Sequence, residues 1–385
     1  MIAPGAIAQR RVYRFTWTIG ALAACLLAVS AYLDLQAALQ SYLFVWWFLL
    51  GIPLGSMVLL MVHNLTGGAW GELIRPVLEA ALSSLPFLLL LSIPLWLGMQ
   101  HLYVWANPDH ALSTPLIEAK EWYLNAFFFL LRVAIYFSAW TALSHLLHKW
   151  SFARHAGSDP GSAKRLRAIS AVGLVVYGVT VTFAAVDWIM SLTPQWYSTT
   201  FGLLAGIGQA LCAFSFATVF TAWFRPGEDS EHRQVFHDLG NLLLMFVMTW
   251  AYLAFTQYLI IWAENLPNEI VWYLPRVQTS WRLIALVLVV FHFALPFLVL
   301  LSRRVKRAPR ALAALAATIL LAHLVDAFWL VAPTFRSTGF AVYWSDAWAA
   351  LALGGLWLAA FMHTGNGATA SSATTHVKAE AVDHV

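Results

Sequence analysis

The chain has 385 residues, of which 61% are hydrophobic and 10% are charged, and its net charge is +4 at pH 7. A soluble chain of this length needs far more polar surface, so the composition excludes a water-soluble globular protein and indicates one that is solvated by lipid. The two cysteines, Cys25 and Cys212, stand in separate apolar stretches without a CxxC or CxxCH motif. This pattern argues against a disulfide framework, a zinc site or covalently attached haem.

A membrane-spanning helix needs roughly 20 apolar residues, and ten stretches of the sequence meet this requirement. The first stretch imitates a signal peptide, but no small-residue cleavage site follows it, so we expect it to be the first span. The sequence therefore predicts an all-α integral membrane protein of about ten transmembrane helices. The predicted helices lie near 14–34, 40–63, 77–103, 122–147, 166–191, 198–223, 238–263, 280–302, 310–332 and 345–363.

The basic residues set the expected orientation. Most of the 22 Lys and Arg residues follow or precede the spans on the side of the N-terminus, and short cytoplasmic loops retain such residues. We therefore predict a multi-pass protein of the bacterial inner membrane with both termini in the cytoplasm. The basic loop 303–310 is interpreted as a topology signal, with binding of anionic lipid as the alternative. The tail 365–385 is rich in Ala, Thr and Ser and is predicted to be disordered.

Helices two to five repeat in the sequence as helices six to nine. Trp122 opens helix four and precedes Arg132 by ten residues, and Trp272 opens helix eight and precedes Arg282 by ten residues. Helices five and nine end in residues of matching type and spacing. These are Asp187, Pro194, Ser198, Thr199 and Phe201 in the first copy, and Asp326, Pro333, Ser337, Thr338 and Phe340 in the second.

Because each copy has an even number of helices, both copies cross the membrane in the same direction, which predicts two parallel four-helix bundles. Helices one and ten are expected to flank them. The predicted parts are the N-terminus with helix one (1–39), the first bundle (40–197), the second bundle (198–340), helix ten (341–364) and the cytoplasmic tail (365–385).

Ionisable residues inside spans are costly and are usually paired or functional. Arg132 and Asp187 are expected at compatible depths in the first bundle, and Arg282 and Asp326 stand in the same relation in the second. One interpretation is a buried Arg–Asp ion pair that holds each bundle together. The other is proton transfer, which needs titratable groups at successive depths. The candidate proton-pathway residues are Asp187, Arg132, Tyr136, Arg282, His292, His323 and Asp326.

Other polar residues lie nearer the cytoplasmic ends and would supply further steps of a proton path, although interfacial histidines more often contact lipid head groups. They are His63, Glu79, His145, His148, His237 and Asp238. Two membrane histidines could also ligate haem, but no same-face pair recurs on neighbouring helices as in a bis-histidine cytochrome. The sequence therefore predicts no metal ligands and no catalytic residues in this chain.

Two motifs and the ten-helix plan resemble a known family. The first motif is HNLTGGAWG at 63–71, after helix two, and the second is VDWIMSL at 186–192, followed by Pro194, Trp196 and Tyr197. Together they resemble the ActF subunits of bacterial alternative complex III, which are similar to the NrfD/PsrC membrane proteins. The resemblance covers all ten helices and leaves only the tail outside. The related ActC subunit is the family member most easily mistaken for ActF.

The resemblance implies a membrane subunit of a quinol:cytochrome c oxidoreductase that has no redox metal of its own. Such a subunit contributes a proton pathway or a scaffold and is not itself expected to be catalytic. The implied cofactors belong to the complex: menaquinone or ubiquinone, with haem c and iron–sulfur clusters in partner subunits. The implied partners are a multihaem cytochrome c subunit, an iron–sulfur subunit, a second NrfD-like membrane subunit, smaller subunits, a terminal oxidase as a further candidate, and lipids, but no nucleic acid.

Two other functions stay open on the sequence. A quinone-binding, quinol-oxidising NrfD-like subunit should have an outer-side pocket lined by a His and an Asp, and Asp187 with the Trp- and Tyr-rich outer edge keeps this alternative open. A stand-alone secondary transporter is the third candidate. The parallel repeat is unusual for that class, and no pair of Gly- or Pro-broken helices marks a midplane substrate site.

Overall fold

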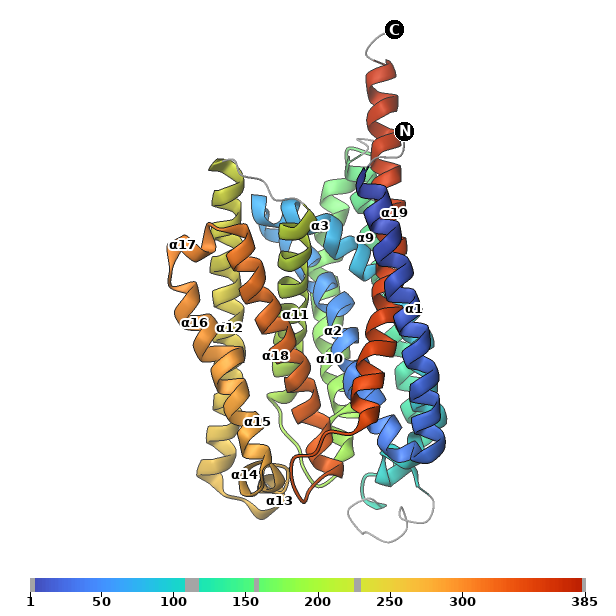
Figure 1. Cartoon of the computed structure of the whole chain (residues 1–385), viewed down its shortest axis with the longest axis vertical. Coiled ribbons are helices and arrows are strands. Elements are labelled where there is room, and N and C mark those ends of the chain that lie inside the picture. The colour runs from blue at the N-terminus through green and yellow to red at the C-terminus, as the bar shows by residue number, and fades with distance from the viewer. Residues whose placement is uncertain (1–3, 108–117, 156–158, 225–229, 383–385) are drawn as a thin grey trace.

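The computed structural model describes residues 4–107, 118–155, 159–224 and 230–382, and within these ranges the elements are helices without any strand (Figure 1). Within the described residues, ten helical segments are long and apolar enough to cross a membrane. The predicted all-α membrane fold is therefore confirmed, and the chain is a multi-pass membrane protein. The spans are Val12–Leu33, Leu35–Thr66, Ala69–Leu97, Ala126–Arg154, Ser162–Leu192, Phe201–Trp223, Arg233–Glu264, Trp281–Leu300, Pro309–Phe335 and Trp344–Thr364.

The helices follow one another along the chain in two halves. The first half contains α1 (Pro4–Leu33), α2 (Leu35–Thr66), α3 (Ala69–Leu82), α4 (Leu85–Leu91), α5 (Ile93–Leu97), α6 (Met99–Leu102), η1 (Val104–Ala106), α9 (Ala126–His155), α10 (Ser162–Trp188) and η2 (Met190–Leu192). The second half contains α11 (Phe201–Phe224), α12 (Ser230–Glu264), α13 (Pro267–Ile270), α14 (Leu274–Gln278), α15 (Trp281–Leu288), η3 (Val289–Ala294), α16 (Leu295–Leu300), α17 (Arg303–Lys306), α18 (Pro309–Phe335) and α19 (Trp344–Val382).

The third span is a succession of short helices, although the sequence predicts one helix over 77–103. It consists of α3, α4 and α5 in turn, and α6 follows it after Gly98. Pro86 and Pro94 stand in the first turns of α4 and α5. Proline has no N–H and its ring clashes with the preceding turn, so the helix ends before each proline and begins again.

The eighth span contains a π-helical segment, η3, between α15 and α16. Pro296 follows it in the first turn of α16 and offers no N–H to the turn before it. Single π-helical turns of this kind occur often at functional sites. This one contains His292, whose side chain is fully buried.

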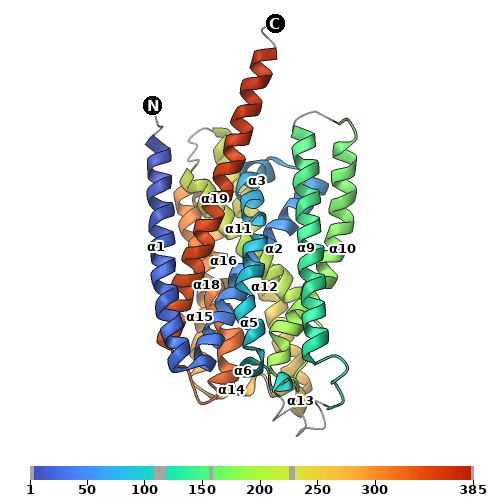
Figure 2. The ribbon, with the colours of Figure 1, turned by 90° about the vertical axis from the view of Figure 1, so that its right-hand side faces the viewer.

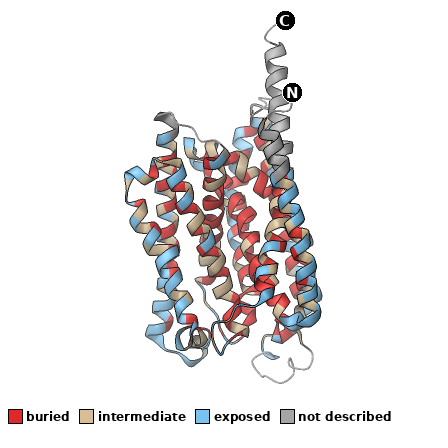
Figure 3. Cartoon of the chain, in the orientation of Figure 1, coloured by how far each residue is buried: buried red, intermediate tan, exposed pale blue. Residues whose placement is uncertain are grey.

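Four helices form the centre of the molecule. The helix α2 packs against α11, and each of these two also packs against both α10 and α18. The second span, α2, is almost completely buried, and Figure 3 shows buried residues concentrated in this central region while α12, α15 and α1 expose much of their surface. The first helices of the two predicted repeats therefore meet in one shared core.

The helices α1 and α19 lie side by side along one flank (Figures 1 and 2). They approach closely at Gly20, where a Cβ would lie 2.8 Å from the backbone nitrogen of Leu356. The helix α1 begins and α19 ends at the same end of the molecule, which we call the terminal end; we call the opposite one the far end (Figure 1).

The tail differs from the expectation of disorder over 365–385. The helix α19 continues from its span to Val382, and residues 383–385 lie outside the described part. Alanine recurs through this segment, and it has the highest helix propensity of the amino acids, so the helix extends beyond the apolar span.

A test of the central packing is Gly55→Leu. A Cβ at Gly55 on α2 would collide with the carbonyl oxygen of Gln209 on α11, so the larger side chain must force the two helices apart. We expect a loss of about 3 kcal/mol in unfolding free energy, measured by thermal unfolding of the purified protein in detergent. Gly178→Leu is the control, because Gly178 is exposed and nothing lies within 4 Å of its added Cβ. Equal melting temperatures for the two variants would show that this close packing is not needed.

Candidate functional site

Asp187 is the centre of the first group of buried ionisable residues, which we call the Asp187 cluster (Arg132, Tyr136 and Asp187). Its carboxylate is fully buried and accepts hydrogen bonds from Nε and Nη2 of Arg132, both at 2.9 Å, and from the hydroxyl of Tyr136 at 2.6 Å. The two nitrogens of one guanidinium thus bind the two carboxylate oxygens, which is the strongest geometry for such a pair. The predicted pairing of Arg132 with Asp187 is confirmed.

The remaining contacts of Arg132 complete its environment. Its Nη1 donates to the carbonyl of Tyr123 at 3.0 Å, and its guanidinium lies 3.8 Å from the centre of the Tyr123 ring. Trp188 packs edge-on against Tyr136. With both charges satisfied by direct partners, the Asp187 cluster joins α9 to α10 as a structural ion pair.

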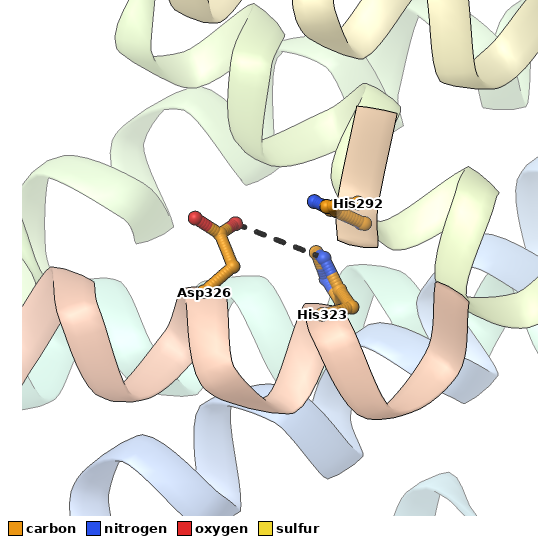
Figure 4. Close-up of side chains that lie close together, drawn as sticks. All are labelled: His292, His323 and Asp326. Atoms are coloured by element: carbon orange, nitrogen blue, oxygen red, sulfur yellow. Dashed lines mark ion pairs between the residues drawn. The ribbon is translucent and has the colours of Figure 1, made fainter. Parts of the chain in front are cut away.

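The second group, which we call the Asp326 cluster (His292, His323 and Asp326), lies between η3 and α18 (Figure 4). All three side chains are buried, and one nitrogen or oxygen atom from each lies within 4.8 Å of the others. His323 Nδ1 is 3.7 Å from Asp326 Oδ2, and the two imidazole rings are 5.5 Å apart between centroids. His292 and His323 stand near the middle of the eighth and ninth spans.

The Asp326 cluster is less completely satisfied than the Asp187 cluster. Both ring nitrogens of His292 and Nδ1 of His323 have no hydrogen-bond partner among the described residues. The indole ring of Trp250 covers His292 at 4.0 Å between centroids and also interacts with Asp326. Within the described part of the chain, no Lys or Arg forms an ion pair with Asp326, and the titratable side chains beside it are the imidazoles of His323 and His292.

The predicted pairing of Arg282 with Asp326 is wrong. Arg282 is exposed at the start of α15. In the first copy α9 begins at Ala126, so Arg132 lies well inside its helix. In the second copy, the residues soon after Trp272 form a separate short helix, α14. The spanning helix α15 begins only at Trp281, one residue before Arg282. The same ten-residue spacing therefore places the two arginines at different depths.

An unpredicted ion pair lies at the far end. Arg336 Nη1 and Nη2 donate to the two oxygens of Asp346, both at 2.8 Å, and both side chains are buried. Asp346 also accepts from the hydroxyl of Ser41 at 2.6 Å. Through the contact with Ser41, the ion pair links the connection between α18 and α19 to α2. The sequence signal was weak: a lone Arg after one span and an Asp in the first turn of the next.

Polar residues also meet at the terminal end, close to the HNLTGGAWG motif. Arg75 is buried, and its Nη2 lies 2.8 Å from His63 Nδ1 and 3.0 Å from Asn64 Oδ1, while Nη1 lies 3.3 Å from Glu79. A cavity of about 10 Å³ beside Asn64, Glu79 and His148 has room for a single water. The structure thus brings together three residues singled out in the sequence, His63, Glu79 and His148, beside the buried Arg75.

A larger cavity of about 280 Å³ opens at the far end, between the connection that follows α10, the last turn of α18 and helix α14 with the residues before it. The described residues that line it include Arg276 but neither a His nor an Asp. It therefore lacks the pair of residues expected for a quinol-oxidising pocket.

The comparisons with known proteins add no family to this description. No protein-family model matches the chain, and no curated protein matches it in sequence. In its described residues, the structure shows a helical membrane protein with ten candidate spans, a satisfied Arg132–Asp187 ion pair, and a cluster of two histidines and an aspartate near mid-span.

Proposed function

We propose that the chain is a membrane subunit of a quinol:cytochrome c oxidoreductase of the alternative complex III type, without a redox metal of its own. In this proposal it lies in the bacterial inner membrane with both termini cytoplasmic, and it contributes a proton pathway and a scaffold. The two sequence motifs support the membership, and the Asp326 cluster carries the proton-transfer role.

The position and the state of the Asp326 cluster favour proton transfer. A titratable group near the middle of a span is costly, so it is retained where it has a use. His323 Nδ1 and Asp326 Oδ2 are 3.7 Å apart, a gap that a small side-chain rotation can close to hydrogen-bond distance. A proton that passes from the Asp326 carboxyl to His323 leaves a carboxylate beside an imidazolium. His292 can then take the proton onward, because imidazole both accepts and donates.

The Asp187 cluster supports the scaffold part of the proposal. Its carboxylate is bound by a guanidinium and a phenol at once, and a group that must exchange protons gains nothing from such strong fixed partners. The two predicted repeats would then have diverged, one keeping a structural ion pair and the other a titratable path. Arg282 belongs to neither, because it is exposed.

The quinol-oxidising alternative lacks support from the far-end cavity, whose described lining has no His or Asp. Purification distinguishes a stand-alone transporter from a subunit of the proposed complex, because a transporter would purify without a haem-bearing partner. We expect the full chain, tagged and extracted from the membranes of its own cell, to bring with it a haem c protein and an iron–sulfur protein, visible as haem absorbance and by mass spectrometry. A chain that purifies alone, without haem absorbance at any mild detergent concentration, would contradict the proposed complex.

A further inference from the structure

Arg276, on α14 at the far end, is a buried cation that pairs with no carboxylate among the described residues. Its side chain is 1% exposed, Nη1 donates to the carbonyl of Trp272 at 2.6 Å, and Nη2 donates to the carbonyl of Leu330 at 2.8 Å. The buried carboxylates Asp187 and Asp346 are already bound by other arginines. Among the described residues, no Asp or Glu forms an ion pair with Arg276, so its charge is not neutralised within this part of the chain.

Aromatic rings hold the guanidinium in place. It lies 3.5 Å from the centre of the Trp272 ring, and Trp272 stacks on Trp196 with 4.5 Å between centroids and 14° between planes. Such contacts orient a cation but leave its net charge unchanged. Burial lowers the pKa of Arg276 well below its ordinary value, because desolvation disfavours the charged form. An anion bound beside Arg276 would favour the charged guanidinium and offset this cost of desolvation.

The far-end cavity of about 280 Å³ offers the place for an anion. Arg276 is part of its wall, with Thr193 and Gln195 as polar neighbours and Val104, Leu192 and Pro275 among the apolar ones. A second cation lies at its edge: Lys120 Nζ donates to the carbonyl of Pro194, which also lines the cavity, at 2.7 Å. The site thus combines positive charge with mainly apolar walls.

This combination fits an amphipathic anion better than a free one. A free phosphate would exchange a full hydration shell for a cavity with few donors, whereas a phospholipid brings acyl chains that gain from apolar contact. Val271 lines the cavity and is 38% exposed, and Val277, next to Arg276 in sequence, is 48% exposed. Trp262, at the far end of α12, is exposed as interfacial tryptophans are. We propose that the cavity beside Arg276 binds the phosphodiester head group of an anionic phospholipid.

The proposal goes beyond the proposed function and does not depend on proton transfer. Its test uses the purified full chain in detergent, with native mass spectrometry and thermal unfolding as readouts. The added probes are dioleoylphosphatidylglycerol, dioleoylphosphatidylcholine and inorganic phosphate. We expect the anionic lipid to bind and to raise the melting temperature, and the zwitterionic lipid and inorganic phosphate to do neither at the same concentration.

Arg276→Gln should weaken binding of the anionic lipid by about tenfold or more, since it removes the buried charge of the site. Arg276→Lys keeps a charge and should retain most of the preference. Arg282→Gln is the matched control, because it removes an exposed arginine six residues away, and it should leave binding unchanged. If Arg276→Gln does not fold, the difference in binding between the two lipids, measured in the wild type and in Arg276→Lys, still tests the proposal. Equal binding of both lipids, an equal effect of inorganic phosphate, or equal loss in Arg282→Gln would overturn the proposal.

Discussion

Replacing Asp326 by Asn is expected to uncouple proton movement from quinol oxidation while leaving the complex assembled. The amide has nearly the shape of the carboxyl but cannot release a proton at neutral pH, so transfer to His323, 3.7 Å away, is blocked. We expect the rate of proton translocation during quinol oxidation to fall by about 10²-fold, the order by which removing a positioned proton-transfer group slows a reaction. The measurement is the pH change inside vesicles that contain the purified complex, driven by quinol and cytochrome c.

Three further variants make this expectation specific. Asp326→Glu keeps the carboxyl and should restore part of the coupling. Asp159→Asn makes the same chemical change in a partly exposed residue paired with Arg165, and it should behave as the wild type. His292→Gln should reduce coupling as Asp326→Asn does, because the imidazole is the only titratable group that η3 brings to the cluster. Full coupling in Asp326→Asn, at normal haem content, would remove the Asp326 cluster from the proton path.

Replacing Asp187 by Asn is expected to act on stability instead. The change leaves the guanidinium of Arg132 without its carboxylate and weakens the acceptor of the Tyr136 hydroxyl. Breaking a buried ion pair on one side costs about 3–5 kcal/mol, and the lower end is expected here because Arg132 is 16% exposed. Thermal unfolding of the purified protein in detergent measures the loss.

The double variant Arg132→Met with Asp187→Leu provides the control for this second expectation. Replacing both charges by apolar side chains removes the unpaired cation, so the double variant should recover most of the stability lost in Asp187→Asn. A different outcome would reassign the cluster: if Asp187→Asn unfolds at the wild-type temperature but loses proton coupling, then the Asp187 cluster belongs to the proton path and not to the scaffold.

The number of spans and their approximate limits could be predicted because lipid imposes a simple rule, an apolar run of sufficient length, on every helix. Within the spans, individual residues determine where helices are interrupted, which this length rule does not predict. Pro86 and Pro94 divide the third span into short helices, and η3 interrupts the eighth. An apolar stretch of sequence has the same appearance whether the backbone hydrogen bonds of its span are α-helical, π-helical or interrupted.

The two clusters show where spacing in the sequence does and does not locate a site. Arg132 and Asp187 meet as expected because α9 and α10 are regular helices that pack side by side. Arg282 fails to reach Asp326 because helix α14 displaces the start of α15. The buried positions of Arg276 and Arg336 could not be predicted from the sequence, because both residues lie outside the spans. Each guanidinium is buried and donates to a residue of a different helix, Leu330 for Arg276 and Asp346 for Arg336.

The divergence of the two repeats also follows from these residues. One aspartate is held by Arg132, which lies inside α9, and the other faces two imidazoles. The proposed division of labour, with a scaffold in the first repeat and proton transfer in the second, therefore depends on the difference between the two copies and not on their likeness.

The most direct test of this account is a density map of the intact complex, purified through this chain and resolved well enough to show ordered water. We expect water molecules that connect His323 with the terminal end of the molecule, no quinone density against this chain, and haem and iron–sulfur density only in neighbouring subunits. A dry Asp326 cluster enclosed by apolar side chains, or a quinone seated beside it, would contradict the account.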